Sequence, residues 1–181
     1  MRVARLVPLA AALLAVTTLA AGCGSKGGET TTVSAADWAS GVCGAVSTYV
    51  DSIKSAATSF KSNPSMSALQ DATKQVSTAT ETFESAIKDL GQPPTENGQQ
   101  AKQAVNDLAS QISDDVDTVQ KAVKDANGVS GLLSAATAAN TAIQAAKTQV
   151  SATVTKLKSL QQGGIAHAFA TEPACTSLGK S

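Results

Sequence analysis

The side chains that could do chemistry are few and poorly partnered. His167 is the only histidine, and its nearest acidic neighbour along the chain is Glu172. A metal ligand or a general base needs partner groups at a defined spacing, and no such set surrounds His167. We therefore expect His167 to have no functional role.

The densest acidic cluster consists of Asp114, Asp115 and Asp117, with Asp107 two turns upstream. Calcium sites use oxygen ligands at alternating loop positions around a glycine turn. A helical period instead places Asp114 and Asp117 on one face and turns Asp115 elsewhere. A solvated helix face is the favoured interpretation, and a cation site is the alternative.

Other signatures of catalysis are missing from the sequence. We find no Gly-rich phosphate loop, no nucleophile elbow and no His or Lys placed to activate one of the many serines. We therefore expect a protein that is not an enzyme, with no cofactor and no metal.

The first 22 residues have the layout of a secretory signal peptide. Arg2 and Arg5 give a short positive segment, and the uncharged apolar stretch 6–21 follows. This stretch is too short for a typical membrane-spanning helix. There is no twin-arginine pair, so we expect the general secretion route.

The junction Leu19-Ala20-Ala21-Gly22-Cys23 resembles the lipobox of bacterial lipoproteins. In that family the cysteine becomes the acylated first residue of the mature chain, although leucine is usual where Ala20 stands. The resemblance implies lipidation of Cys23 and attachment to the outer face of the cell membrane. Plain secretion, with Cys23 as a free thiol, is the alternative.

With Cys23 acylated, Cys43 and Cys175 remain, and an extracytoplasmic pair is expected to oxidise to a disulfide. Two free thiols are the alternative. Without Arg2 and Arg5, 12 of the 14 basic residues remain against 14 acidic ones, so the mature chain has a formal charge of −2. This balance does not favour nucleic acid as a partner.

Four stripes of apolar or small residues recur at steps of three and four, which predicts four helices. They run from Ala39 to Phe60, from Leu69 to Leu90, from Ala101 to Ala126, and from Leu132 or Leu133 to Leu160. Short connections make sequential helices antiparallel. The prediction is an all-α fold, an antiparallel up-down-up-down four-helix bundle.

We expect residues 1–22 to be the signal peptide, 23–34 a lipidated flexible tether, and 35–181 the bundle with a C-terminal tail. The caps expected for the four helices are Ser34 or Asp37, Asn63, Thr95 and Ser130. In the tail, Ile165 and Phe169 are expected to pack down on the end that carries Cys43.

Trp38-x4-Cys43, the Ala-rich helices and the late Cys175 together resemble a group of small secreted proteins and lipoproteins of actinobacteria. No activity follows from this resemblance. Trp38 is expected to pack under the tail, with contact to lipid headgroups as the alternative.

Two functions stay open. The first is a non-enzymatic interaction module of the cell envelope with a protein partner. The second is a small-molecule or lipid binding protein with a cavity inside the bundle. Thr73 and Thr80 interrupt the second stripe, either lining such a cavity or bonding to the carbonyl one turn back. A binder needs a cavity, whereas an interaction module needs a filled core and an apolar patch outside it.

Overall fold

The computed structural model describes residues 33–160 and 164–178. The predicted signal peptide, Cys23 and nearly all of the predicted tether lie outside these residues. Most of the described residues are helical and none lies in a strand, which confirms the all-α class. The helices are α1 (Ala35–Ser62), α2 (Met66–Asp89), α3 (Gly98–Asp125), α4 (Gly128–Lys158), α5 (Ile165–Thr171) and α6 (Pro173–Leu178).

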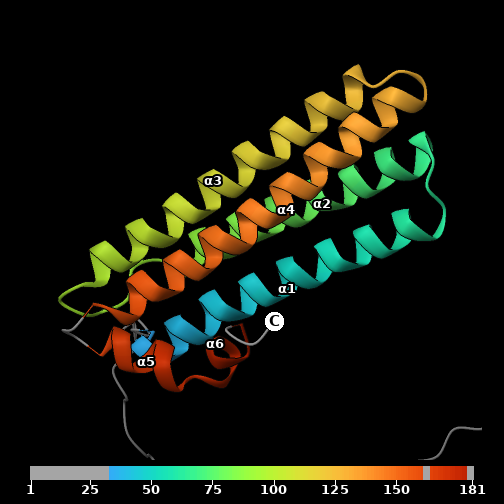
Figure 1. Ribbon diagram of the computed structural model, residues 1–181. Coiled ribbons are helices and arrows are strands. Elements are labelled where there is room, and N and C mark those ends of the chain that lie inside the picture. Colours follow the sequence, from blue (N-terminus) through green and yellow to red (C-terminus); the bar gives the residue numbers. More distant parts are fainter. Residues whose placement is uncertain (1–32, 161–163, 179–181) are drawn as a thin grey trace, which may run out of the picture. The chain divides into compact units, whose positions relative to one another are not determined.

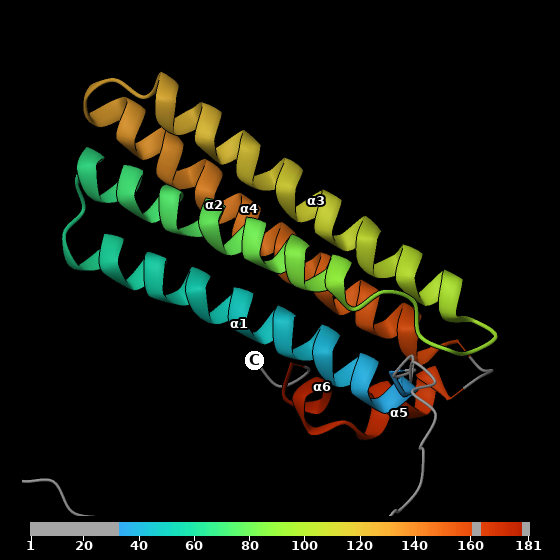
Figure 2. The ribbon, with the colours of Figure 1, turned by 180° about the vertical axis from the view of Figure 1, so that it is seen from behind.

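Figures 1 and 2 show the four long helices side by side, each running opposite to the one before it. α1 packs on α2, α2 on α3 and α3 on α4, while α5 and α6 lie against the beginning of α1. Within residues 33–160 and 164–178, no helix combines the length and the hydropathy needed to cross a bilayer.

The predicted stripes of α1, α2 and α3 form the core. Seven of the eight positions in the α3 stripe are buried, the exception being the C-cap Ala126. Five of the seven positions in the α1 stripe are also buried. Burial of about 25 cal/mol per Å² of apolar surface is the main force that brings such faces together. The core therefore lies where the period of three and four places it.

α4 fits its predicted stripe less well. Of the predicted positions only Ala146 and Leu157 are buried, and Ala135 is buried in place of its neighbour Ala136. Leu133 is 69% exposed and Val129 is 85% exposed. α4 therefore contributes one edge of the apolar core and leaves part of its apolar surface uncovered.

The helix starts confirm one predicted cap and correct the other three. Ser34, one of the two predicted caps of α1, accepts a hydrogen bond from the Asp37 N–H (3.1 Å), and the two residues form a capping box. Asn63 is the C-cap of α1 and not the N-cap of α2, because Ser65 accepts the Ala68 N–H at 3.1 Å. The hydroxyl nearest the first helical turn therefore takes the capping role.

α3 and α4 begin at positions other than those predicted. Thr95 lies in a turn with Pro93, and Asn97 precedes the first residue of α3. α4 begins at Gly128, two residues before the predicted cap Ser130. Gly128 has φ +62°, which glycine adopts without the strain that a side chain would add. This glycine lets α4 follow α3 after a very short connection.

Candidate functional site

The predicted cysteine pair is a disulfide that ties α6 to α1. The Cα atoms of Cys43 and Cys175 are 5.0 Å apart, and both residues are fully buried. The Cys175 sulfur also lies 3.4 Å from the Ala39 carbonyl oxygen. The tail predicted to fold back on this end does so, because Ile165 and Phe169 of α5 are fully buried.

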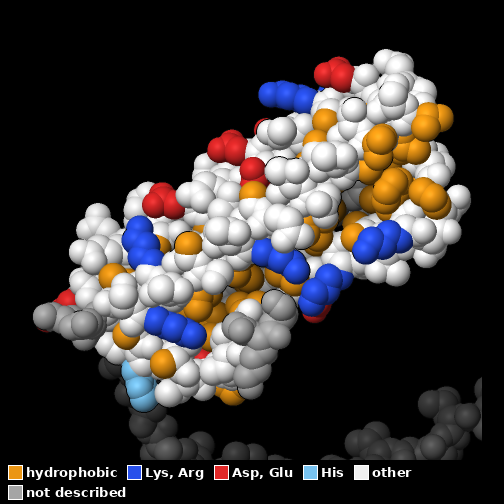
Figure 3. Space-filling model, viewed as in Figure 1, with side chains coloured by type: hydrophobic (Ala, Val, Ile, Leu, Met, Phe, Trp, Pro, Cys, Tyr) orange, Lys and Arg blue, Asp and Glu red, His pale blue; other side chains and the backbone are white. Residues whose placement is uncertain are grey.

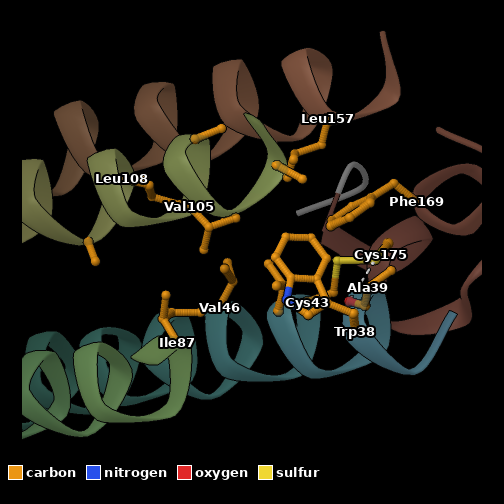
Figure 4. Close-up of a cluster of buried hydrophobic side chains, with 14 of the residues drawn as sticks. Trp38, Ala39, Cys43, Val46, Ile87, Val105, Leu108, Leu157, Phe169 and Cys175 are labelled. Atoms are coloured by element: carbon orange, nitrogen blue, oxygen red, sulfur yellow. Dashed lines mark hydrogen bonds between the residues drawn. A yellow bond between two sulfur atoms is a disulfide. The ribbon is translucent and has the colours of Figure 1, made fainter. Parts of the chain in front are cut away.

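Trp38 completes the cluster at this end, as Figure 4 shows. Its indole is 1% exposed and meets the Phe169 ring edge-to-face, with 5.9 Å between the centroids. The indole N–H donates to the Gly91 carbonyl at 3.2 Å. Packing under the tail is thus confirmed for Trp38, and its polar atom is satisfied.

The predicted chemistry candidates lie apart from one another. His167 is exposed on α5, and Asp114 and Asp117 are exposed on α3. Among the residues that the structure describes, no group of His, Cys, Asp or Glu side chains is suited to hold a metal ion. Asp114 and Asp117 are therefore part of a solvated face, as expected.

Asp115 differs from its two neighbours because it turns inward. It accepts a hydrogen bond from the Gln149 amide of α4 at 3.0 Å. Burial raises the pKa of the Tyr49 phenol, and the negative charge of Asp115 adds to this rise while a hydrogen bond with Thr80 opposes it. Polar groups of all four long helices thus meet halfway along the core.

Thr73 and Thr80 form the hydrogen bonds expected within their own helix. Their hydroxyls donate to the Leu69 and Val76 carbonyls at 2.8 and 3.0 Å. Thr73 also lines a space of about 50 Å³ between the helices, which is too small for an organic ligand. The two threonines therefore line no cavity of ligand size.

A groove of about 380 Å³ lies between α1 and α4. Figure 3 shows hydrophobic side chains in this hollow with lysines beside it. Its apolar floor comes from Val50, Ile53, Ile143, Ala146, Val150 and Val154. Leu178 of α6, three residues after the disulfide, borders the groove at the end that the disulfide clamps.

Three lysines also line this groove: Lys54 from α1, and Lys147 and Lys158 from α4. Lys54 lies 3.7 Å from the Asp51 carboxylate, with both side chains more than half exposed. Lys147 and Lys158 have no ion-pair partner among the described residues. The groove therefore offers an apolar floor and uncompensated positive charge.

Another depression, of about 850 Å³, lies between α1 and α2. Polar side chains such as Ser52, Lys74 and Thr78 make up most of its lining, and Asp71 balances the charge of Lys74. This depression is more open to solvent than the groove between α1 and α4. Small-molecule sites are concave and bury most of the ligand, so the groove is the better candidate.

The sequence interpretation did not find this groove. Its alternative of a binding protein required a cavity inside the helices, lined by Ala and Thr, whereas Val, Ile and Lys make up most of the lining of the observed groove. One signal was present in the sequence, because the stretch that forms α4 contains three lysines and no acidic residue.

Comparison of the chain with models of protein families, with curated proteins and with solved structures finds no match.

Proposed function

We propose that this chain is a lipid-anchored extracytoplasmic binding protein that holds a small, largely apolar molecule in the groove between α1 and α4. The observation that carries the proposal is the groove itself. Its volume of about 380 Å³ falls in the range of about 300–1,000 Å³ found for small-molecule sites. Six aliphatic side chains on its floor provide a surface from which a ligand would displace water.

A binding role fits the lining better than catalysis does. Lysine, serine and threonine are the polar residues within reach of a ligand, apart from the Tyr49 phenol. General acid–base chemistry uses groups poised near neutral pH, most often His or a carboxylate. Neither residue type is part of the lining, so we infer that the ligand leaves the groove unchanged.

The location outside the cytoplasm rests on two features of the chain. The lipobox-like segment that ends at Cys23 predicts acylation at the outer face of the membrane. The Cys43–Cys175 disulfide supports the same compartment, because disulfides persist where thiols are not kept reduced. We propose that the anchored protein holds its ligand at the cell envelope.

A second function, an interaction module of the envelope, has one observation in its favour. Val129 and Leu133 expose large apolar side chains at the beginning of α4. They lie on successive turns and so share one face of the helix. This patch suits a protein partner. The groove favours the first proposal because its size and lining fit a small ligand.

Native mass spectrometry of the protein, extracted from its envelope without reductant, tests the binding proposal. We expect a small molecule that stays bound to the acylated, disulfide-closed chain. Ala57→Trp places an indole in the groove and should abolish this extra mass. The matched control is Ala36→Trp, an exposed position of the same helix that does not line the groove.

The comparison of the two variants decides the result. Loss of the ligand from Ala57→Trp alone supports the groove as its site. A ligand-free wild-type chain, or equal ligand retention by both variants, would refute the proposal. Circular dichroism of each variant checks that its helices are intact, so that unfolding is not mistaken for a blocked groove.

A further inference from the structure

The charges of the four long helices are divided unequally between two sides of the helical unit. α1 and α4 together carry five lysines and two aspartates. α2 and α3 carry five lysines and nine acidic residues. The pair of helices that borders the groove is thus positive by three charges, whereas the other pair is negative by four.

This division places the groove at the positive side of a chain whose formal net charge is zero. Three of the five lysines on α1 and α4 line the groove, and two of these, Lys54 and Lys147, do so from opposite helices. A cleft lined by one sign of charge with apolar walls concentrates ions of the opposite sign. The groove is therefore complementary to an anion that also has an apolar part.

The groove is also elongated. Its lining on α4 begins at Ile143 and ends at Lys158, which corresponds to about 22 Å at 1.5 Å per residue. A volume of about 380 Å³ over this length leaves a narrow channel. This long and narrow shape suits a single extended acyl chain.

We propose that the groove binds an amphiphile with one acyl chain and one anionic head. The chain lies on the floor of Val50, Val150 and Val154, and the head lies between Lys54 and Lys147. This inference rests on the proposed binding function and names its ligand class. A free fatty acid and a single-chain phospholipid share this chemistry.

The ion pair between Lys54 and Asp51 does not prevent this use. Both side chains are more than half exposed, and exposed ion pairs contribute little to stability. Lys54 can therefore exchange Asp51 for the head of the ligand at small cost. Lys147 has no such pair among the described residues and is available without any exchange.

Calorimetric titration with soluble amphiphiles tests the inference. The full chain carrying Cys23→Ser, purified without detergent, is titrated with dodecanoate, uncharged monododecanoylglycerol and dodecyltrimethylammonium. We expect dodecanoate to bind most tightly and the ammonium amphiphile least tightly. Shortening the acyl chain should weaken binding by up to about fourfold per methylene, since each buried CH2 contributes about 0.8 kcal/mol.

The double variant Lys54→Gln/Lys147→Gln should bind dodecanoate about tenfold more weakly and the uncharged amphiphile unchanged, because exposed charge pairs each contribute up to about 1 kcal/mol. Lys88→Gln/Lys121→Gln removes two charges from α2 and α3 outside this groove and should change neither affinity. High salt should reduce the preference for dodecanoate.

Each other outcome overturns a distinct part of the reasoning. Equal binding of dodecanoate and the uncharged amphiphile, without effect of the lysine variant, would refute the anionic head and leave the binding function standing. Failure of all probes, together with a ligand-free native chain, would refute both proposals. Lysine-dependent binding to anionic phospholipid vesicles, without binding of monomeric dodecanoate, would show a membrane-facing surface and refute the groove ligand. If dodecanoate binds as expected, comparison with a single-chain phosphate amphiphile distinguishes a free fatty acid from a single-chain phospholipid as the ligand.

Discussion

The disulfide between Cys43 and Cys175 should contribute strongly to the stability of this protein. The two residues are 132 positions apart. In the chain-entropy treatment, closing a loop of that length lowers the entropy of the unfolded chain enough to stabilise the fold by about 5 kcal/mol. For a domain of about this size, 1 kcal/mol shifts Tm by about 2–4 °C. Removal of the disulfide should therefore lower Tm by about 10–20 °C.

The perturbation is the double substitution Cys43→Ala/Cys175→Ala, in a chain that also carries Cys23→Ser to prevent mispairing. Two signals follow thermal unfolding: circular dichroism reports the helices, and Trp38 fluorescence reports the clamped end. Trp38 is the only tryptophan, so its signal is unambiguous. Reduced protein with both sulfurs retained is the control, because it separates the loss of the cross-link from the loss of buried side-chain volume.

A Tm within about 3 °C of the oxidised protein, for both the double variant and the reduced chain, would refute this reasoning. It would mean that the unfolded chain is already compact enough for the cross-link to remove little entropy. A large drop in the double variant alone would instead assign the effect to packing around the two buried sulfurs. Equal drops in both samples would support the entropic account.

Two further predictions concern α1. Burial raises the pKa of Tyr49, the only tyrosine, above 10, so the folded state favours the neutral phenol. The neutral phenol therefore contributes to stability below pH 10, and this contribution is lost as the pH rises towards the folded-state pKa. Ultraviolet titration of the phenolate should give a midpoint above 10 in the folded protein, and a midpoint at or below 10 would contradict the burial of its hydroxyl. Gly44→Ala should stabilise the protein by about 0.5–1 kcal/mol in urea unfolding, because its new methyl group meets open space. Gly41→Ala should gain less or lose stability, because its Cβ would overlap Leu90, and an equal gain at both positions would contradict the close contact between α1 and the end of α2.

The all-α class and the approximate extents of the helices follow from the sequence because α1, α2 and α3 each bury one continuous stripe. In α3 the large residues Leu108 and Ile112 contrast strongly with their polar neighbours, so the period is unmistakable. In the first half of α4 the stripe depends on Ala136 and Ala139, and alanine also occupies other faces of the helix there, at Ala135 and Ala138. Periodicity then identifies the helix but not the face that is buried, which explains the exchange of Ala135 for Ala136.

The ends of the helices were harder to predict for a different reason. Asn63 and Ser65 are both good N-cap residues, and the sequence alone gives each a claim to α2. The choice depends on Asn63 already serving α1, where its N–H donates to the Phe60 carbonyl at 3.2 Å. Such competition between adjacent helices is decided by the geometry of the turn and not by residue preference.

The groove could not be predicted from the sequence because it depends on how closely α1 and α4 approach each other. The residues on its floor belong to the predicted stripes or lie beside them, so their positions in the sequence predict burial in the core equally well. Only the packing of the helices leaves Val50 and Val150 partly uncovered while Val46 is buried. The lysines were visible as charges, but their position at one groove follows only from the antiparallel arrangement of α1 and α4.

The cross-link between α1 and α6 also changes the topology of the chain. Residues 43–175 form one covalent ring, and this ring contains α2, α3, α4, α5 and most of α1. A protease that cuts the backbone once within the ring, for instance between α2 and α3, opens it without releasing a fragment. The two pieces stay joined through the sulfurs, with their apolar faces at high local concentration. A copy cut once within the ring would therefore remain a single covalent molecule.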